Sequence, residues 1–284
     1  MPESDKNLPD VSEVAIDPSD LTGDAFWELY GSKFDSAVFP RQSFDTVWQF
    51  AEENSADFER HNFDHAKETL WSAMELADYC EENGEEVDRV ALVLAALTHD
   101  NGVDEDYKTL GFDSEEEYAA ALCDKVARSL DPKLPESTIV VAKQAVRDTA
   151  INADLSTIES KVMVNADLQN VGEDYEVSFL PVTKKLWQEY QQRYEKPGSM
   201  ANDILFIKIS IGVLRGYIAK DLSLGPFDRR GWHAHAKQNV ERLNEELQSA
   251  LSLARRRPAD IGLAVIKAVI DHLPLEDKNQ GDGS

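Results

Sequence analysis

The chain has 284 residues, of which 42% are hydrophobic, so it is long enough to bury a sizeable core. Acidic residues outnumber Lys and Arg by 54 to 29, and the formal net charge of -25 argues against binding to nucleic acid or to an anionic membrane. The two cysteines, Cys80 and Cys123, are too few for a disulfide framework or a zinc knuckle.

The start of the sequence lacks the basic and apolar stretches of a secretory signal peptide. The apolar run from Ile204 to Leu214 is too short to span a bilayer, and it contains Lys208. We therefore expect a cytoplasmic protein that has no membrane partner.

Sparse Pro and Gly, together with long stretches of helical periodicity, predict an all-α fold. We expect a flexible N-terminal segment at 1–22, a helical domain at 23–225, a C-terminal helical extension at 226–273 and a flexible tail at 274–284. The amphipathic extension is expected to cover the core or to form an oligomer interface.

The helical pattern begins at Phe26 and continues along the chain between turn-forming residues. The further helices are predicted at about 43–58, 62–83, 87–100, 114–130, 136–151, 156–168, 174–194, 200–221, 229–254 and 260–272.

The most buried of these helices is expected to end in a metal-competent pair. Eight consecutive apolar residues, Val90 to Leu97, lead into Thr98, His99 and Asp100. A helix that is apolar on every side belongs in a core, where an imidazole or a carboxylate needs a partner or a metal.

Two further polar residues are predicted to meet this pair. His65 lies in the first turn of the preceding helix, for which Asn62 or Asp64 is a plausible N-cap. A short loop makes the two helices antiparallel, so that His65 and His99 come to the same edge. Asp167 follows an apolar stretch and also requires a partner.

These residues form a spaced set: His61-Asn62-Phe63-Asp64-His65, then His99-Asp100, then Asn165-Ala166-Asp167-Leu168 with Gly172 shortly after. The set resembles the H…HD…D signature of the HD-domain superfamily of metal-dependent phosphohydrolases. It is most similar to the predicted metal-dependent HD phosphohydrolases of bacterial and archaeal genomes. The resemblance covers about Phe58 to Tyr190, and it implies an HD-domain-like helical bundle with additional C-terminal helices.

The resemblance implies that His65, His99, Asp100 and Asp167 bind one divalent cation. Two-metal HD proteins carry further histidines between the His-Asp pair and the last Asp, and this chain has none there. A mixed imidazole and carboxylate set suits Mn²⁺, Fe²⁺, Mg²⁺ or Zn²⁺. Such an ion would activate water and bind a phosphoryl oxygen, with Asp100 as a catalytic residue.

Arg60, His61 and Asn62 are the candidate substrate-binding residues. Arg60 could hold a phosphate or could be solvated, and His61 could contact phosphate, serve as an acid or cap a helix. Asp104 is a candidate catalytic base, although acidic residues in such loops are more often solvated, and the same holds for Asp106.

Two cationic and two imidazole side chains lie farther along the chain. Lys208 and Arg215 could face the site, although snorkelling at the edge of the core is the simpler interpretation. His233 and His235 are two residues apart, which does not place them on one helix face.

The expected function is hydrolysis of a phosphate ester of a small molecule, with nucleotides among the candidates. One alternative is a (p)ppGpp-type pyrophosphohydrolase, but this chain lacks the Glu of the His-Asp-x-x-Glu-Asp pattern that those enzymes have after the pair His99-Asp100. A second alternative is a non-catalytic HD protein that binds a nucleotide.

Overall fold

A computed structural model describes residues 17–151, 153–193, 200–220 and 231–256. All regular structure in these residues is helical, which confirms the all-α prediction. The α-helices are α1 (Gly23–Tyr30), α2 (Arg41–Asn54), α3 (Phe63–Glu82), α4 (Arg89–Thr98), α5 (Glu115–Ser129), α6 (Glu136–Arg147), α7 (Ile158–Asp167), α8 (Leu180–Arg193), α9 (Met200–Ile218) and α10 (Trp232–Arg256). Short 3-10 or π turns lie at Pro18–Asp20, Gly31–Lys33, Gln169–Gly172 and Tyr175–Phe179.

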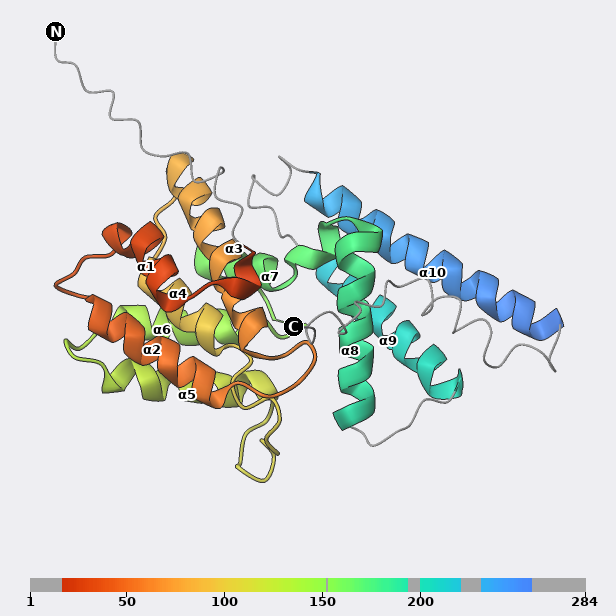
Figure 1. Ribbon diagram of the computed structural model, residues 1–284, viewed down its shortest axis with the longest axis horizontal. Helices are drawn as coiled ribbons and strands as arrows, with labels where there is room; N and C mark the ends of the chain where they lie inside the picture. Colours follow the sequence, from red (N-terminus) through yellow and green to blue (C-terminus); the bar gives the residue numbers. More distant parts are fainter. Residues whose placement is uncertain (1–16, 152, 194–199, 221–230, 257–284) are drawn as a thin grey trace, which may run out of the picture.

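The helices bury two hydrophobic cores that meet at α7 (Figure 1). Helices α1 to α7 form the first core, and α8 to α10 form the second with the turns that precede α8. Among the helices that the structure describes, none has the length and apolar character needed to traverse a bilayer.

Helix α4 lies at the centre of the first core, as its apolar sequence predicts. Every residue from Ala91 to Leu97 is fully buried. The helix packs against α2, α3, α5, α6 and α7, so all of its faces are covered. Its N-terminus is capped by Asp88, whose carboxylate accepts a hydrogen bond from the Ala91 amide at 3.0 Å.

Helix α3 runs beside α4 and begins where α4 ends. The Asn62 side chain is the N-cap, and it accepts a hydrogen bond from the His65 amide at 3.1 Å. This cap begins the helix at Phe63 and therefore places His65 in the first turn, as predicted. Helix α7 packs across α3 and α4 and ends at Asp167.

Two predicted helices end earlier than the periodicity suggests. Helix α2 ends at Asn54 rather than Phe58, because the side chains of Asn54 and Ser55 donate to the carbonyls of the last turn. Helix α6 ends at Arg147 rather than Ile151. The next residue, Asp148, accepts a hydrogen bond from the Ser160 hydroxyl of α7, which holds the chain away from the helical path.

Helix α10 buries the apolar face that its periodicity predicts. Val240, Leu243 and Leu247 lie in the second core against residues of the preceding turns and of α9. The predicted domain boundary at 225, the predicted helix at 260–272 and the predicted tail at 274–284 lie outside the described residues.

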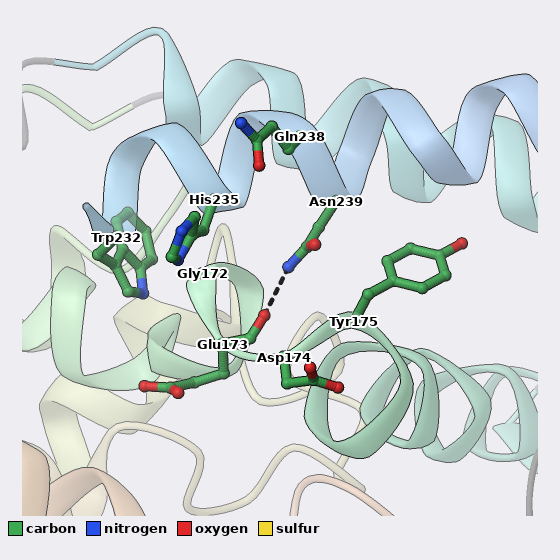
Figure 2. A pocket seen from close by; sticks show the side chains of 8 residues that line it. All are labelled: Gly172, Glu173, Asp174, Tyr175, Trp232, His235, Gln238 and Asn239. Atoms are coloured by element: carbon green, nitrogen blue, oxygen red, sulfur yellow. Dashed lines mark hydrogen bonds between the residues drawn. The ribbon is translucent and has the colours of Figure 1, made fainter. Parts of the chain in front are cut away.

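A surface hollow of about 460 Å³ lies between the start of α10 and the turns after α7 (Figure 2). Trp232 and Asn239 of α10 line one side, and Glu173 and Tyr175 line the other. The Asn239 amide donates to the Glu173 carbonyl at 2.7 Å, so this hydrogen bond joins the two sides.

Gly172→Ala is expected to destabilise the fold by about 1–3 kcal/mol, because a Cβ at this buried position would overlap the indole ring of Trp232. That ring also donates to the Gln169 carbonyl at 2.9 Å, so it has little freedom to move. Urea denaturation measures the change. The control is Gly212→Ala in α9, where a Cβ meets no atom within 4 Å, and we expect it to be neutral or to stabilise by up to about 1 kcal/mol. Equal effects of the two substitutions would contradict this explanation.

Candidate metal centre

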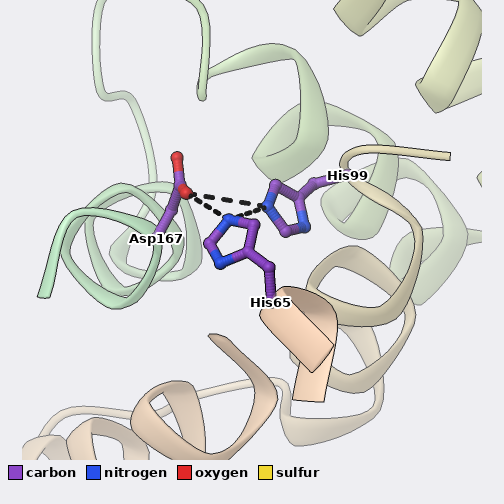
Figure 3. Close-up of side chains that lie close together, drawn as sticks. All are labelled: His65, His99 and Asp167. Atoms are coloured by element: carbon purple, nitrogen blue, oxygen red, sulfur yellow. Dashed lines mark hydrogen bonds and ion pairs between the residues drawn. The ribbon is translucent and has the colours of Figure 1, made fainter. Parts of the chain in front are cut away.

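Three helices bring His65, His99 and Asp167 together at one edge of the first core (Figure 3). The Nε2 atoms of His65 and His99 lie 3.4 Å apart. Asp167 Oδ1 lies 2.9 Å from Nε2 of His65 and 3.7 Å from Nε2 of His99. Within the described part of the chain, these three side chains form a group whose donor atoms all lie within 4.8 Å of one another, close enough to hold a metal ion.

Asp100 lies beside this group. Its Oδ2 atom is 3.1 Å from Nε2 of His99 and 3.4 Å from Nε2 of His65. The same atom is buried and makes no hydrogen bond of acceptable geometry. Burying such a carboxylate oxygen without compensation is costly, and a cation between it and the imidazoles would provide the compensation.

The orientation of His99 suits a metal ligand. Its Nδ1 lies 3.0 Å from the Ala96 carbonyl, and because a carbonyl only accepts, Nδ1 carries the proton of that hydrogen bond. A neutral His99 therefore presents the Nε2 lone pair to the centre of the group. Metal-binding histidines are typically oriented in this way by a hydrogen bond from the other ring nitrogen.

The separations between the donor atoms fit a single ion. Two donors that are each about 2.1 Å from a shared cation lie about 3.0–3.4 Å apart when they subtend 90–109°. The distance between the two Nε2 atoms, 3.4 Å, falls in this interval. The donor atoms of His65, His99 and Asp167 are therefore close enough together to hold a metal ion.

In the absence of a metal, the main effect of the two carboxylates is on the pKa of His99. Burial lowers the pKa of its imidazole, but Asp100 and Asp167 outweigh burial and raise that pKa well above 6.5. Burial and the neighbouring Arg60 guanidinium lower the pKa of His65 to about 4. The pKa values of both carboxyl groups fall below their usual range despite burial, because the histidines stabilise the charged forms. A proton on His99 thus provides part of the positive charge that a cation would supply.

The candidate substrate-binding residues differ in what their side chains contact. Arg60 is 7% exposed, and its guanidinium pairs with Glu68 at 3.0 Å and reaches the Asp167 carbonyl at 3.5 Å. It therefore anchors the end of α7. Asn62 forms the N-cap of α3, and its amide donates to the Phe58 carbonyl.

The predicted acidic and basic candidates outside the cluster lie at the surface. Asp104 and Asp106 are exposed on the loop after α4, and in the described structure no hydrogen bond links them to the cluster. Lys208 is exposed on α9, and Arg215 pairs with Glu241 of α10 at 3.0 Å.

Two residues near the centre were not anticipated from the sequence. Glu189 of α8 is 2% exposed, and its carboxylate lies 2.7 Å from Nδ1 of His61. Tyr217 of α9 donates to the Thr149 carbonyl at 2.5 Å, and its pKa is raised first by burial and also by Asp167 and Asp100. Their sequence signal is weak, because each lies in a helix with no short motif.

Comparison with known proteins adds no relative to this description. No protein-family model matches the chain, and no curated protein matches it. The spaced residues and the geometry that brings them together therefore provide the basis for inferring the function.

Proposed function

We propose that the chain is a single-metal phosphohydrolase that cleaves a phosphate ester of a small molecule. The observation that carries the proposal is the convergence of two buried imidazole Nε2 atoms with the carboxylates of Asp100 and Asp167. The resemblance of their spacing to the HD signature gives this arrangement its expected chemistry.

The centre is accessible from its carboxylate side. The side chains of His65 and His99 are each 2% exposed, whereas those of Asp100 and Asp167 are 23% and 22% exposed. The imidazoles thus form the buried side and the carboxylates the rim, where water and a phosphoryl group can approach.

Each residue has a distinct part in the proposed reaction. A divalent ion held here would lower the pKa of bound water and offset charge on the phosphoryl oxygens. His65 and His99 provide neutral nitrogen donors from rigid helix ends. Asp100 and Asp167 balance the charge of the ion, and their outer oxygens accept hydrogen bonds from a water molecule at the rim.

The test is a reconstitution assay with a panel of phosphate esters. The protein is stripped with EDTA, loaded in turn with Mn²⁺, Fe²⁺, Mg²⁺ or Zn²⁺, and assayed for inorganic phosphate and for pyrophosphate. We expect metal-dependent release of phosphate from at least one sugar phosphate or nucleotide, and no release by His65→Ala.

Other outcomes identify the alternatives. Release of pyrophosphate in place of phosphate would support the alternative that the chain is a (p)ppGpp-type pyrophosphohydrolase. Saturable nucleotide binding by the metal-loaded protein, with no turnover across the panel, would identify a non-catalytic binding protein and overturn the proposal.

A further inference from the structure

A buried carboxylate of α8 holds His61 beside the metal centre. Glu189 Oε1 lies 2.7 Å from Nδ1 of His61, and Glu189 Oε2 accepts from the His61 amide at 3.2 Å. Both oxygens of one carboxylate therefore contact one residue, at its ring and at its backbone. Because a carboxylate accepts, Nδ1 carries the proton of this bond, and the adjacent negative charge also favours the imidazolium form, in which Nε2 carries a second proton.

The position of His61 suits contact with a substrate. Its ring centroid is 6.0 Å from that of His65, and its side chain is 27% exposed. The Nε2 atom lies on the side of the ring away from Nδ1, and it has no hydrogen-bond partner within the part of the chain that the structure describes. The ring thus leaves one nitrogen available next to the rim of the centre.

Arg193, one turn after Glu189, holds α8 in place. Its guanidinium donates to the Val103 carbonyl at 2.9 Å and to Glu115 at 2.6 Å, and it lies 3.6 Å from the Glu189 carboxylate. Val103 follows the His99-Asp100 pair closely in the chain. Helix α8 is therefore fixed both to His61 and to the loop on the other side of the centre.

We propose that Glu189 is a positioning residue that orients a protonated His61 ring so that its Nε2–H donates a hydrogen bond to a phosphoryl oxygen of the substrate. The inference rests on the proposed function, because it assigns the ring to a phosphate ester in the metal centre. A purely structural Glu189 would hold α8 against the first core without affecting phosphate binding.

The probe that distinguishes these roles is inorganic phosphate, titrated by calorimetry into the Mn²⁺-loaded full-length protein. Glu189→Ala and His61→Gln should each weaken phosphate binding by about 10-fold or more, and the double variant should be no weaker than either. Mn²⁺ content should equal that of the wild type in all three. Glu189→Gln keeps an acceptor for Nδ1–H and should retain most of the affinity.

The matched control is Glu115→Gln, which removes the ion pair between Arg193 of α8 and Glu115 of α5 without touching His61. Its phosphate affinity should equal that of the wild type. A second readout is the ¹⁵N spectrum of the imidazoles in the metal-free protein, where both ring nitrogens of His61 should carry a proton in the wild type and the second proton should be lost at a lower pH in Glu189→Ala.

Several results would overturn the inference: unchanged phosphate affinity in Glu189→Ala, an equal loss in Glu115→Gln, or a Glu189→Gln protein as weak as Glu189→Ala. A wild-type protein that binds Mn²⁺ but no phosphate would overturn both this inference and the proposed function. If the variants show the expected phosphate affinities but the wild type turns over no ester, the result would count against the proposed function and not against this inference.

Discussion

His99→Ala is expected to lose most of its bound divalent cation and to remain folded. The substitution removes one of the two buried nitrogens that face the centre, and alanine offers no ligand in its place. The affinity should therefore fall by more than the 10- to 100-fold that is typical when a partner of a metal ligand is changed, a range of about 1.4–2.7 kcal/mol. Elemental analysis after dialysis measures the metal, and circular dichroism measures the fold.

The matched control for this substitution is His233→Ala, which removes an exposed imidazole of α10. Its metal content should equal that of the wild type. A folded His99→Ala protein that retains a full equivalent of metal contradicts the assignment of His99 as a ligand.

Asp167→Asn is expected to separate the metal-binding role of this side chain from a structural one. Asparagine keeps an oxygen that can accept the 2.9 Å hydrogen bond from Nε2 of His65, but it removes one of the two negative charges at the centre. In a partly dry site that charge is poorly screened, so the affinity for a divalent cation should fall strongly.

Thermal unfolding with EDTA and with Mn²⁺ provides the measurement. Mn²⁺ at a hundred times its dissociation constant stabilises a protein with one site by about 2.7 kcal/mol, so the wild type should melt several degrees higher with Mn²⁺ than with EDTA. Asp167→Asn should lose most of this increase and should melt close to the wild type in EDTA. A large loss of stability in EDTA, with the increase from Mn²⁺ intact, would show that Asp167 has a structural role only.

The helices that hold the metal-binding residues could be predicted because their local sequence determines where they begin and whether they are buried. The apolar run before His99 predicts a buried helix because no face of it can be solvated, and α4 is buried along its length. The Asn62 cap places His65 in the first turn of α3. Since both helices are joined by a short connection, their polar ends meet at one edge.

Contacts between distant parts of the chain were harder to predict from the sequence. Glu189 lies 128 residues from His61, and nothing in its own helix marks it as the partner of that ring. Arg60 resembles a phosphate ligand in sequence, but in the fold its charge is paired with Glu68. The early ends of α2 and α6 depend on side-chain hydrogen bonds that periodicity does not encode.

Anomalous scattering from crystals soaked in Mn²⁺ tests the central claim most directly. We expect one strong peak about 2 Å from Nε2 of both His65 and His99, with oxygens of Asp100 and Asp167 completing the protein ligands. A peak elsewhere in the molecule, or none at these four side chains in crystals that contain manganese, would contradict the account.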